Sequence, residues 1–202
     1  MRRHTHRWTE GVNPRLVPIG EATSTRVDVK RRIIVGIDLS LRAAAAAKVV
    51  LPWDGDLEDV RTCIVGRDLG LAATPRERAE RLEHIVNRLA DFCTDATDIH
   101  LEEYAFAASG AHAHAIGEVG GSLKLWFRKH LDRDPLPVHS AAARKTMLQK
   151  LPRSEVKKFV VRNVKRLGSP ATGWTDDQID AFVVMNHGVM LAGGVALTFA
   201  GE

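Results

Sequence analysis

Acidic residues occur at three places where a folded core would not be expected to hold them. Asp38 ends the apolar run RRIIVGID, which has the β-branched composition of a buried strand. Glu102 lies in a second apolar segment, DIHLEEY, and Asp177 and Asp180 stand just before the apolar stretch AFVVM. A carboxylate in or beside a core costs free energy unless something pairs with it. These acids are therefore the first candidates for chemistry.

Each acid alone has an ordinary structural explanation. Asp176 and Asp177 fall in the first turn of an expected helix, where acids complement the positive end of the helix dipole. Glu102 and Glu103 are neighbours in an expected strand, so they point to opposite faces and one of them can simply be solvated. Asp38 could bind a backbone amide at a turn. A chemical role is indicated only by the acids as a group.

Gathered in one place, these carboxylates would need a cation. Two carboxylates about 4 Å apart repel by roughly 4 kcal/mol at an effective dielectric constant of about 20. A hard divalent ion relieves that repulsion, and oxygen-only ligands favour Mg²⁺ or Mn²⁺. Two such ions can activate a water and stabilise the leaving oxygen in phosphodiester hydrolysis. This chemistry requires that the strands of Asp38 and Glu102 are neighbours and that the last helix packs on them.

The elements that would position the acids form an α/β pattern. Strands are expected at 32–38, 43–51, 60–66, 98–104 and 135–139, and helices at 74–94, 109–131, 154–167 and 176–191. The short links between the first three strands favour an antiparallel meander. The second helix contains Gly117, Gly120 and Gly121, each of which costs up to about 1 kcal/mol relative to alanine. We expect them to allow close approach of another backbone, in the core or across a dimer interface.

Charge is distributed unevenly along the 202 residues. The net charge is +4, yet the segment 144–166 holds nine basic residues against one acid. This asymmetry predicts a polyanionic partner, with a solvated helix face as the alternative. The basic residues are Arg144, Lys145, Lys150, Arg153, Lys157, Lys158, Arg162, Lys165 and Arg166.

The remaining composition narrows the class of protein. Cys63 and Cys93 are far apart and give no zinc pattern or disulfide framework, which fits a reducing, cytoplasmic compartment. No apolar run is long enough to span a membrane, and no signal peptide is expected. Residues 1–30 are polar and aperiodic, so we expect a flexible basic arm there and one folded domain at 31–202.

The acidic motifs, in this order, resemble those of the ribonuclease-H-like nucleases, and most closely the RuvC family of Holliday junction resolvases. The matching stretches are GIDLSLR, HLEEYAF and DDQIDA, and the resemblance covers residues 32–191. It implies a ribonuclease-H-like fold, with a five-stranded mixed sheet, three antiparallel strands followed by two more, flanked by helices. The divergent sequence between motifs looks more like a bacteriophage member than a bacterial housekeeping one, which would place it in the host cytoplasm.

The resemblance also implies roles for particular residues. The metal ligands would be Asp38, Glu102, Asp177 and Asp180, with Asp176 in reserve if the helix is rotated. They would hold two Mg²⁺ ions per site, with Mn²⁺ able to substitute. Lysines near the scissile phosphate would be Lys145 and Lys157, or Lys158 in place of Lys157. Backbone phosphates would be gripped by Arg144, Lys145, Lys150, Arg153, Lys157 and Lys158.

Two further roles stay open. Tyr104 and Phe106 flank the position, Ala105, at which the family places a base-stacking aromatic, but core packing explains them equally well. His187 falls seven residues after Asp180; a packed or solvated histidine is favoured over a proton shuttle.

The resulting hypothesis is a metal-dependent, structure-specific endodeoxyribonuclease that acts on Holliday junctions and other branched DNA. The resemblance implies 5′-phosphate products and a homodimer, and no membrane or small-molecule cofactor is expected. The alternatives are a ribonuclease-H-like nuclease that cuts RNA–DNA hybrids or flaps, a non-catalytic DNA-binding protein of the same fold, and, less consistent with the short chain, a transposase or integrase core.

Overall fold

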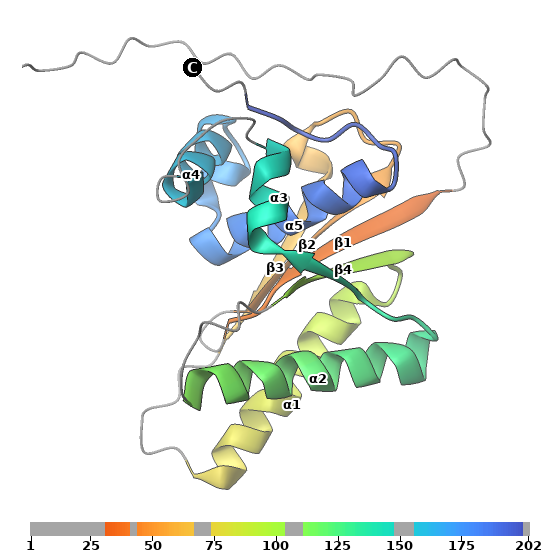
Figure 1. Cartoon of the computed structure of the whole chain (residues 1–202), viewed down its shortest axis with the longest axis vertical. Helices are drawn as coiled ribbons and strands as arrows, with labels where there is room; N and C mark the ends of the chain where they lie inside the picture. The colour runs from red at the N-terminus through yellow and green to blue at the C-terminus, as the bar shows by residue number, and fades with distance from the viewer. Residues whose placement is uncertain (1–30, 41–43, 67–73, 104–110, 148–155, 200–202) are drawn as a thin grey trace, which may run out of the picture.

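A computed structural model describes residues 31–40, 44–66, 74–103, 111–147 and 156–199 (Figure 1). The strands are β1 (Arg32–Asp38), β2 (Ala44–Leu51), β3 (Arg61–Val65), β4 (Asp98–Glu103) and β5 (Leu136–His139). The helices are α1 (Pro75–Cys93), α2 (Ala111–Leu131), α3 (Ser140–Met147), α4 (Val156–Arg166) and α5 (Asp176–Leu191), with short 3₁₀ turns at Leu57–Asp59 and Ala171–Gly173. The expected arm at 1–30 lies outside the described residues.

The strands form one mixed sheet in the order β3-β2-β1-β4-β5. The first three strands are antiparallel neighbours, as the short links predicted, while β4 runs parallel to β1 and β5 parallel to β4. Helices α1 and α2 cover one face of the sheet, and α3, α4 and α5 lie on the other (Figure 1). The predicted fold class, a five-stranded mixed sheet flanked by helices, is confirmed.

Alternation along the central strands divides the apolar residues between two cores. In β1, Val35 and Ile37 pack toward α1 and α2, whereas Ile34 packs toward α5. In β2, the odd-numbered Ala45 and Ala47 belong to the α5 core. These small side chains leave room for a helix close to the sheet. The positions of β1 that face α5 therefore include Ile34, Gly36 and, at the end of the strand, Asp38.

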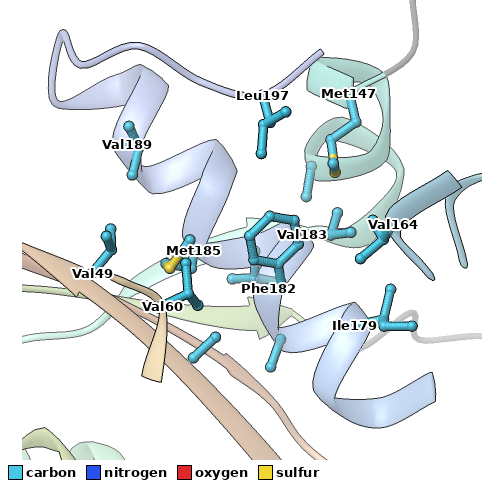
Figure 2. Packing of buried hydrophobic residues seen from close by; sticks show 14 of the residues in the cluster. Val49, Val60, Met147, Val164, Ile179, Phe182, Val183, Met185, Val189 and Leu197 are labelled. Atoms are coloured by element: carbon cyan, nitrogen blue, oxygen red, sulfur yellow. The ribbon is translucent and has the colours of Figure 1, made fainter. Parts of the chain in front are cut away.

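Helix α5 is the central element of the second core. Every residue from Ile179 to Asn186 is buried, because the helix has the sheet on one side and α3, α4 and the C-terminal segment around the other. Figure 2 shows Phe182 amid Met147, Val164 and Val183. An all-round apolar helix is what such enclosure requires.

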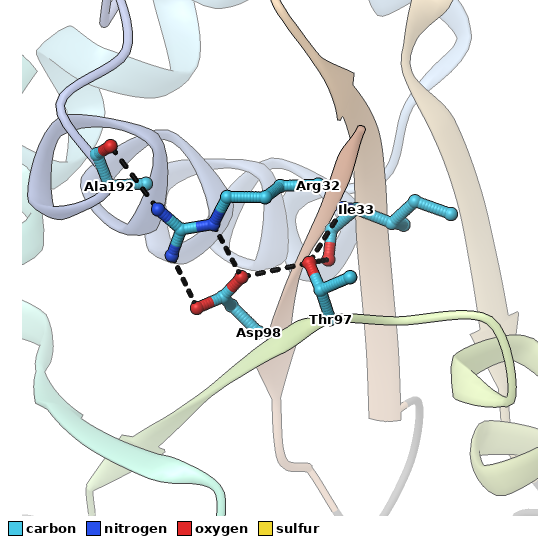
Figure 3. A network of polar contacts seen from close by, with 5 residues as sticks. All are labelled: Arg32, Ile33, Thr97, Asp98 and Ala192. Atoms are coloured by element: carbon cyan, nitrogen blue, oxygen red, sulfur yellow. Dashed lines mark hydrogen bonds and ion pairs between the residues drawn. The ribbon is translucent and has the colours of Figure 1, made fainter. Parts of the chain in front are cut away.

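A polar network at the opposite end of the sheet fixes the register of β1 against β4 (Figure 3). The Arg32 guanidinium donates to both carboxylate oxygens of Asp98, at 2.6 and 3.1 Å, and also reaches the Ala192 carbonyl at the end of α5 at 3.4 Å. Thr97 and Ile33 exchange hydrogen bonds of 2.8 Å, the Thr97 hydroxyl accepting from the Ile33 amide. These contacts tie β1, β4 and α5 together before the strands reach the acids.

Two sequence expectations need adjustment. No separate helix was expected at 140–147, where α3 begins directly after β5. The glycines of α2 were expected to allow close approach of another backbone, in the core or across a dimer interface; a β-carbon on Gly117 or Gly121 would meet nothing within 4 Å in the described part of the chain. The first alternative therefore does not hold for those two positions, and the second stays a prediction. No helix within the described ranges combines the length and apolar character needed to cross a membrane.

Candidate active site

The register of the parallel pair β1 and β4 places Asp38 beside Glu102. The last recorded pair is Ile37 with Leu101, so the next residue on each strand is the acid. Asp38 and Glu102 lie on the same face of the sheet as Gly36 and point toward α5. Ile37 and Leu101 lie on the other face, in the core under α1 and α2. The condition that these strands be neighbours is therefore met.

Asp38 interacts with three other carboxylates. Its side chain is buried, and burial is the main reason that its pKa is raised far above the usual range. A side-chain hydrogen bond with Glu102 and the negative charges of Glu102, Asp180 and Asp177 raise the pKa further. Acids from β4 and α5 thus lie close enough to Asp38 to oppose its ionisation.

A capping box and a close contact with β1 position the acids at the start of α5. Thr175 caps the helix, accepting from the Gln178 amide at 3.2 Å, while the Gln178 side chain accepts from the Thr175 amide at 2.9 Å. A β-carbon on Gly36 would lie 2.5 Å from the Ala181 carbonyl oxygen. Because only glycine allows this approach, Asp180, the residue before Ala181, is held next to Asp38.

Both oxygens of Asp180 are engaged by cations from other helices. The Arg144 guanidinium of α3 donates to Oδ1 at 3.1 Å, and the Lys157 ammonium of α4 contacts Oδ2. The Asp180 side chain is only 8% exposed, so these charge-assisted contacts are partly shielded from water. Two positive charges therefore stand at the acid cluster.

The structure separates Asp176 from Asp177. The Asp176 side chain is 63% exposed and lies 3.6 Å from the Lys165 ammonium, on the α4 side. Asp177 is half-buried; burial raises its pKa first, and the charge of Asp180 second. Asp177 therefore belongs to the cluster with Asp38 and Asp180, and Asp176 lies outside it.

The donor set suits a hard divalent cation. The cluster offers carboxylate oxygens, which Mg²⁺ and Mn²⁺ prefer. In the described ranges, however, no three His, Cys, Asp or Glu side chains converge closely enough to hold a metal ion as they stand. Asp180 instead directs its oxygens to Arg144 and Lys157. The carboxylates therefore suit a divalent cation in their chemistry. In the arrangement that the structure describes, Arg144 and Lys157 neutralise the Asp180 carboxylate.

Of the predicted cations, Lys157 reaches the cluster and Lys145 does not. From α3 the contact to Asp180 comes from Arg144, which was expected only to bind DNA phosphates, whereas Lys145 is exposed. Adjacent helix residues point about 100° apart, so only one of the two can face the acids. Lys158 is exposed on α4. The predicted residues Tyr104, Phe106, Lys150 and Arg153 lie outside the described residues.

The remaining polar residues near the site have partners away from the cluster. Glu103 points to the opposite side from Glu102 and pairs with His139, Nε2 to Oε2 at 3.0 Å. The His187 Nδ1 lies 2.6 Å from the Thr146 hydroxyl, which joins α5 to α3. Burial lowers the pKa of His187, as it lowers that of His100 to about 4. His187 is half-buried and contacts Thr146, away from the acids, which agrees with the packed or solvated histidine that was favoured over a proton shuttle.

Comparison with solved structures finds the same fold in RuvC. Two structures of Thermus thermophilus RuvC, one of them in complex with a Holliday junction substrate, superpose with a TM-score of 0.55 and 15% identity, over 82% of this chain and 99% of that one. The yeast mitochondrial Holliday junction resolvase Ydc2 gives a TM-score of 0.49 and 14% identity over 75% of each chain. No protein-family model matches the chain, and no curated protein does. The RuvC-like fold that the motifs predicted is confirmed.

Proposed function

We propose that this protein is a metal-dependent, structure-specific DNA endonuclease that resolves Holliday junctions and related branched DNA by hydrolysing phosphodiester bonds. The observation that carries the proposal is the cluster itself: Asp38 interacts with Glu102, Asp177 and Asp180 beside two cationic side chains. A purely structural site has no evident use for a buried carboxyl whose ionisation is opposed by three neighbouring acids.

The acidic and the basic residues of the site would have different roles in the reaction. The four carboxylates would hold a pair of divalent ions, which when bound supply an activated water and stabilise the leaving oxygen. Lys157 and Arg144 lie beside the acids, where positive charge can stabilise the additional negative charge that develops on the phosphate in the transition state. Asp38 and Glu102 come from rigid neighbouring strands, which fixes the spacing of their carboxylates without a loop.

The DNA-binding surface would extend from the cluster along α3 and α4. Exposed basic side chains on these helices are Lys145, Lys157, Lys158, Arg162 and Arg166. Because phosphates lack sequence information, such a surface grips DNA of any sequence and weakens steeply with salt. The shared fold of RuvC, one structure of which holds a Holliday junction, supports a branched substrate for this surface.

We further propose a homodimer through α2. Gly117, Gly121 and Leu125 are spaced four residues apart and so share one helix face. Nothing in the described residues lies where a β-carbon on either glycine would be, and the Leu125 side chain is 55% exposed. This face is smooth enough for a second helix to approach. A two-fold dimer would present two related sites to two of the four strands of a four-way junction.

A direct test compares labelled substrates with and without Mg²⁺. We expect the protein to cut a synthetic four-way junction, with little cutting of a linear duplex or an RNA–DNA hybrid. Preferred cutting of the hybrid or of a flap would instead indicate a ribonuclease-H-like nuclease of another specificity. Junction binding without metal-stimulated cutting of any substrate would indicate a non-catalytic DNA-binding protein.

The neighbouring pair Asp176 and Asp177 provides a matched test of the site. We expect Asp177→Asn to abolish junction cleavage, by about 10²-fold or more, because it removes a carboxylate from the cluster. Asp176→Asn removes the same charge one residue away and should keep cleavage within about threefold, since its side chain faces Lys165. Equal losses in both variants would contradict the assigned cluster. Junction binding in EDTA should survive in both.

A further inference from the structure

The Asp180 carboxylate is satisfied without a metal. Its two oxygens each meet a different cation, Arg144 on one side and Lys157 on the other. A divalent ion that shares Asp180 would be placed within a few ångströms of the same ammonium group, and like charges at that range repel strongly. The two kinds of cation therefore compete for one carboxylate.

The two protein cations differ in how readily they can leave. The Lys157 side chain is 52% exposed and stands in the first turn of α4, whereas that of Arg144 is 21% exposed between α3 and α5. An ammonium on a four-carbon stem is a mobile point charge that water or a phosphate can accept in place of a carboxylate. A guanidinium in a fixed geometry loses more by moving. Lys157 is thus the contact that can be exchanged.

Resting on the proposed function, we propose that Lys157 is a displaceable cation: it neutralises Asp180 in the metal-free protein and transfers to a DNA phosphate when a divalent ion takes up the site. Arg144 stays on Asp180 and acts as a positioning residue.

This exchange couples the binding of metal and of DNA. A phosphate that attracts Lys157 away from Asp180 leaves the carboxylate free, so DNA should tighten metal binding. By thermodynamic reciprocity, metal should tighten DNA binding by the same factor. A lysine that merely gripped DNA would contribute to DNA affinity without changing the affinity for metal in the absence of DNA.

The test titrates the full-length chain with Mn²⁺ alone in a calorimeter and compares Lys157→Met with Lys158→Met. We expect Lys157→Met to bind Mn²⁺ about fivefold tighter or more, the lower range of typical coupling, while cutting a junction more slowly. Lys158→Met removes the same charge from the adjacent, exposed position and should bind Mn²⁺ as the wild-type protein does. Ca²⁺ titrations with and without an uncut four-way junction should show tighter Ca²⁺ binding on DNA for wild type and a reduced effect for Lys157→Met.

A variant that keeps the positive charge at position 157 separates the loss of charge from any effect of the substitution on folding. Lys157→Arg retains the contact with Asp180 and should bind Mn²⁺ no tighter than wild type. Mn²⁺ affinity of Lys157→Met equal to or below that of wild type would overturn the exchange, even if wild type cuts junctions in Mg²⁺. Failure of the wild-type protein to bind Mn²⁺ at all would instead overturn the proposed nuclease function.

Discussion

Gly36 of β1 lies directly against the backbone of Met185 in α5: a β-carbon on Gly36 would stand 2.1 Å from the Met185 amide nitrogen. The same β-carbon would lie 2.5 Å from the Ala181 carbonyl oxygen. Strand and helix therefore touch along their backbones, two residues from Asp38 on the strand and one residue from Asp180 on the helix. The distance between Asp38 and Asp180 is therefore set by Gly36, which has no side chain to hold β1 and α5 apart.

We therefore expect Gly36→Ala to damage both the fold and the site. The added methyl meets backbone atoms, which cannot turn aside, so α5 must shift; overpacking of this kind costs roughly 3 kcal/mol, at the upper end of its usual range. Urea unfolding measures the loss, and junction cleavage should fall with it. Gly173→Ala, whose β-carbon would meet nothing within 4 Å in the described residues, should instead leave stability within about 0.5 kcal/mol of wild type. Equal stability of the two variants would contradict the close contact.

Asp38→Asn should stabilise the metal-free protein while abolishing cleavage. Because burial and the charges of Glu102, Asp177 and Asp180 raise the pKa of Asp38, folding at pH 8 must keep this carboxyl protonated at a cost that asparagine does not have, so we expect a gain of about 1 kcal/mol or more in EDTA. Thermal unfolding in EDTA at pH 8 measures this gain. Added Mg²⁺ should raise the Tm of wild type and leave that of Asp38→Asn nearly unchanged, because ligand binding stabilises only the state that binds. A lower Tm for the variant in EDTA would argue against a strained cluster.

The pair Arg32–Asp98 gives a pH-dependent contribution to stability (Figure 3). Burial opposes ionisation of Asp98, but hydrogen bonds from Arg32 and Thr97 outweigh it and hold the pKa of Asp98 below its usual value. A carboxyl with a lowered folded-state pKa adds stability that is present above its unfolded pKa, about 3.9, and is lost as the pH falls through the folded value.

We expect Asp98→Asn to lower the free energy of unfolding by about 1 kcal/mol at pH 7, a modest figure because both partners are partly exposed. The difference from wild type should shrink as the pH falls below about 4. Urea unfolding at several pH values measures it. A difference that stays constant down to pH 3 would mean that the charge of Asp98 contributes nothing.

The α2 face gives a prediction about assembly. Leu125→Glu places a charge in the middle of the proposed dimer contact, so the variant should be monomeric at concentrations at which wild type is dimeric. Light scattering after size exclusion measures the mass of each. Leu191→Glu, at an equally exposed leucine near the end of α5, should remain dimeric. A monomeric wild type, or a dimeric Leu125→Glu, would place the interface elsewhere or remove it.

Much of the fold follows from local pattern. The apolar β-branched runs predicted the strands, and the helices expected at 74–94 and 176–191 correspond to α1 and α5, which begin within one residue of the expected positions after the capping residues Thr74 and Thr175. The short links predicted the antiparallel meander of β1 to β3. Helix α3 was not assigned, because eight residues directly after a strand show too little periodicity to reveal a helix.

The candidate site was predicted by chemistry rather than by pattern. Asp38 and Glu102 stood out because an acid in an apolar strand needs a reason, and the resemblance to the RuvC family motifs implied Asp177 and Asp180 as the other two acids, which lie near Asp38 in the structure. It left Asp176 and Asp177 as alternatives, since both favour the first turn of a helix equally. The rotation of α5 decides between them, and that rotation is fixed by the contact of Gly36 with Ala181 and Met185.

Arg144 shows what only the tertiary structure could decide. Its neighbour Lys145 has the same charge, and nothing in the local sequence says which of the two faces inward. The choice depends on how α3 packs against α5, where Thr146 meets His187 and Met147 enters the core. The residue types in segment 144–166 predicted that positive charge would lie near these acids. The directions in which side chains point were decided by contacts between segments distant in sequence, because a helix can present any of its faces until another element packs on it.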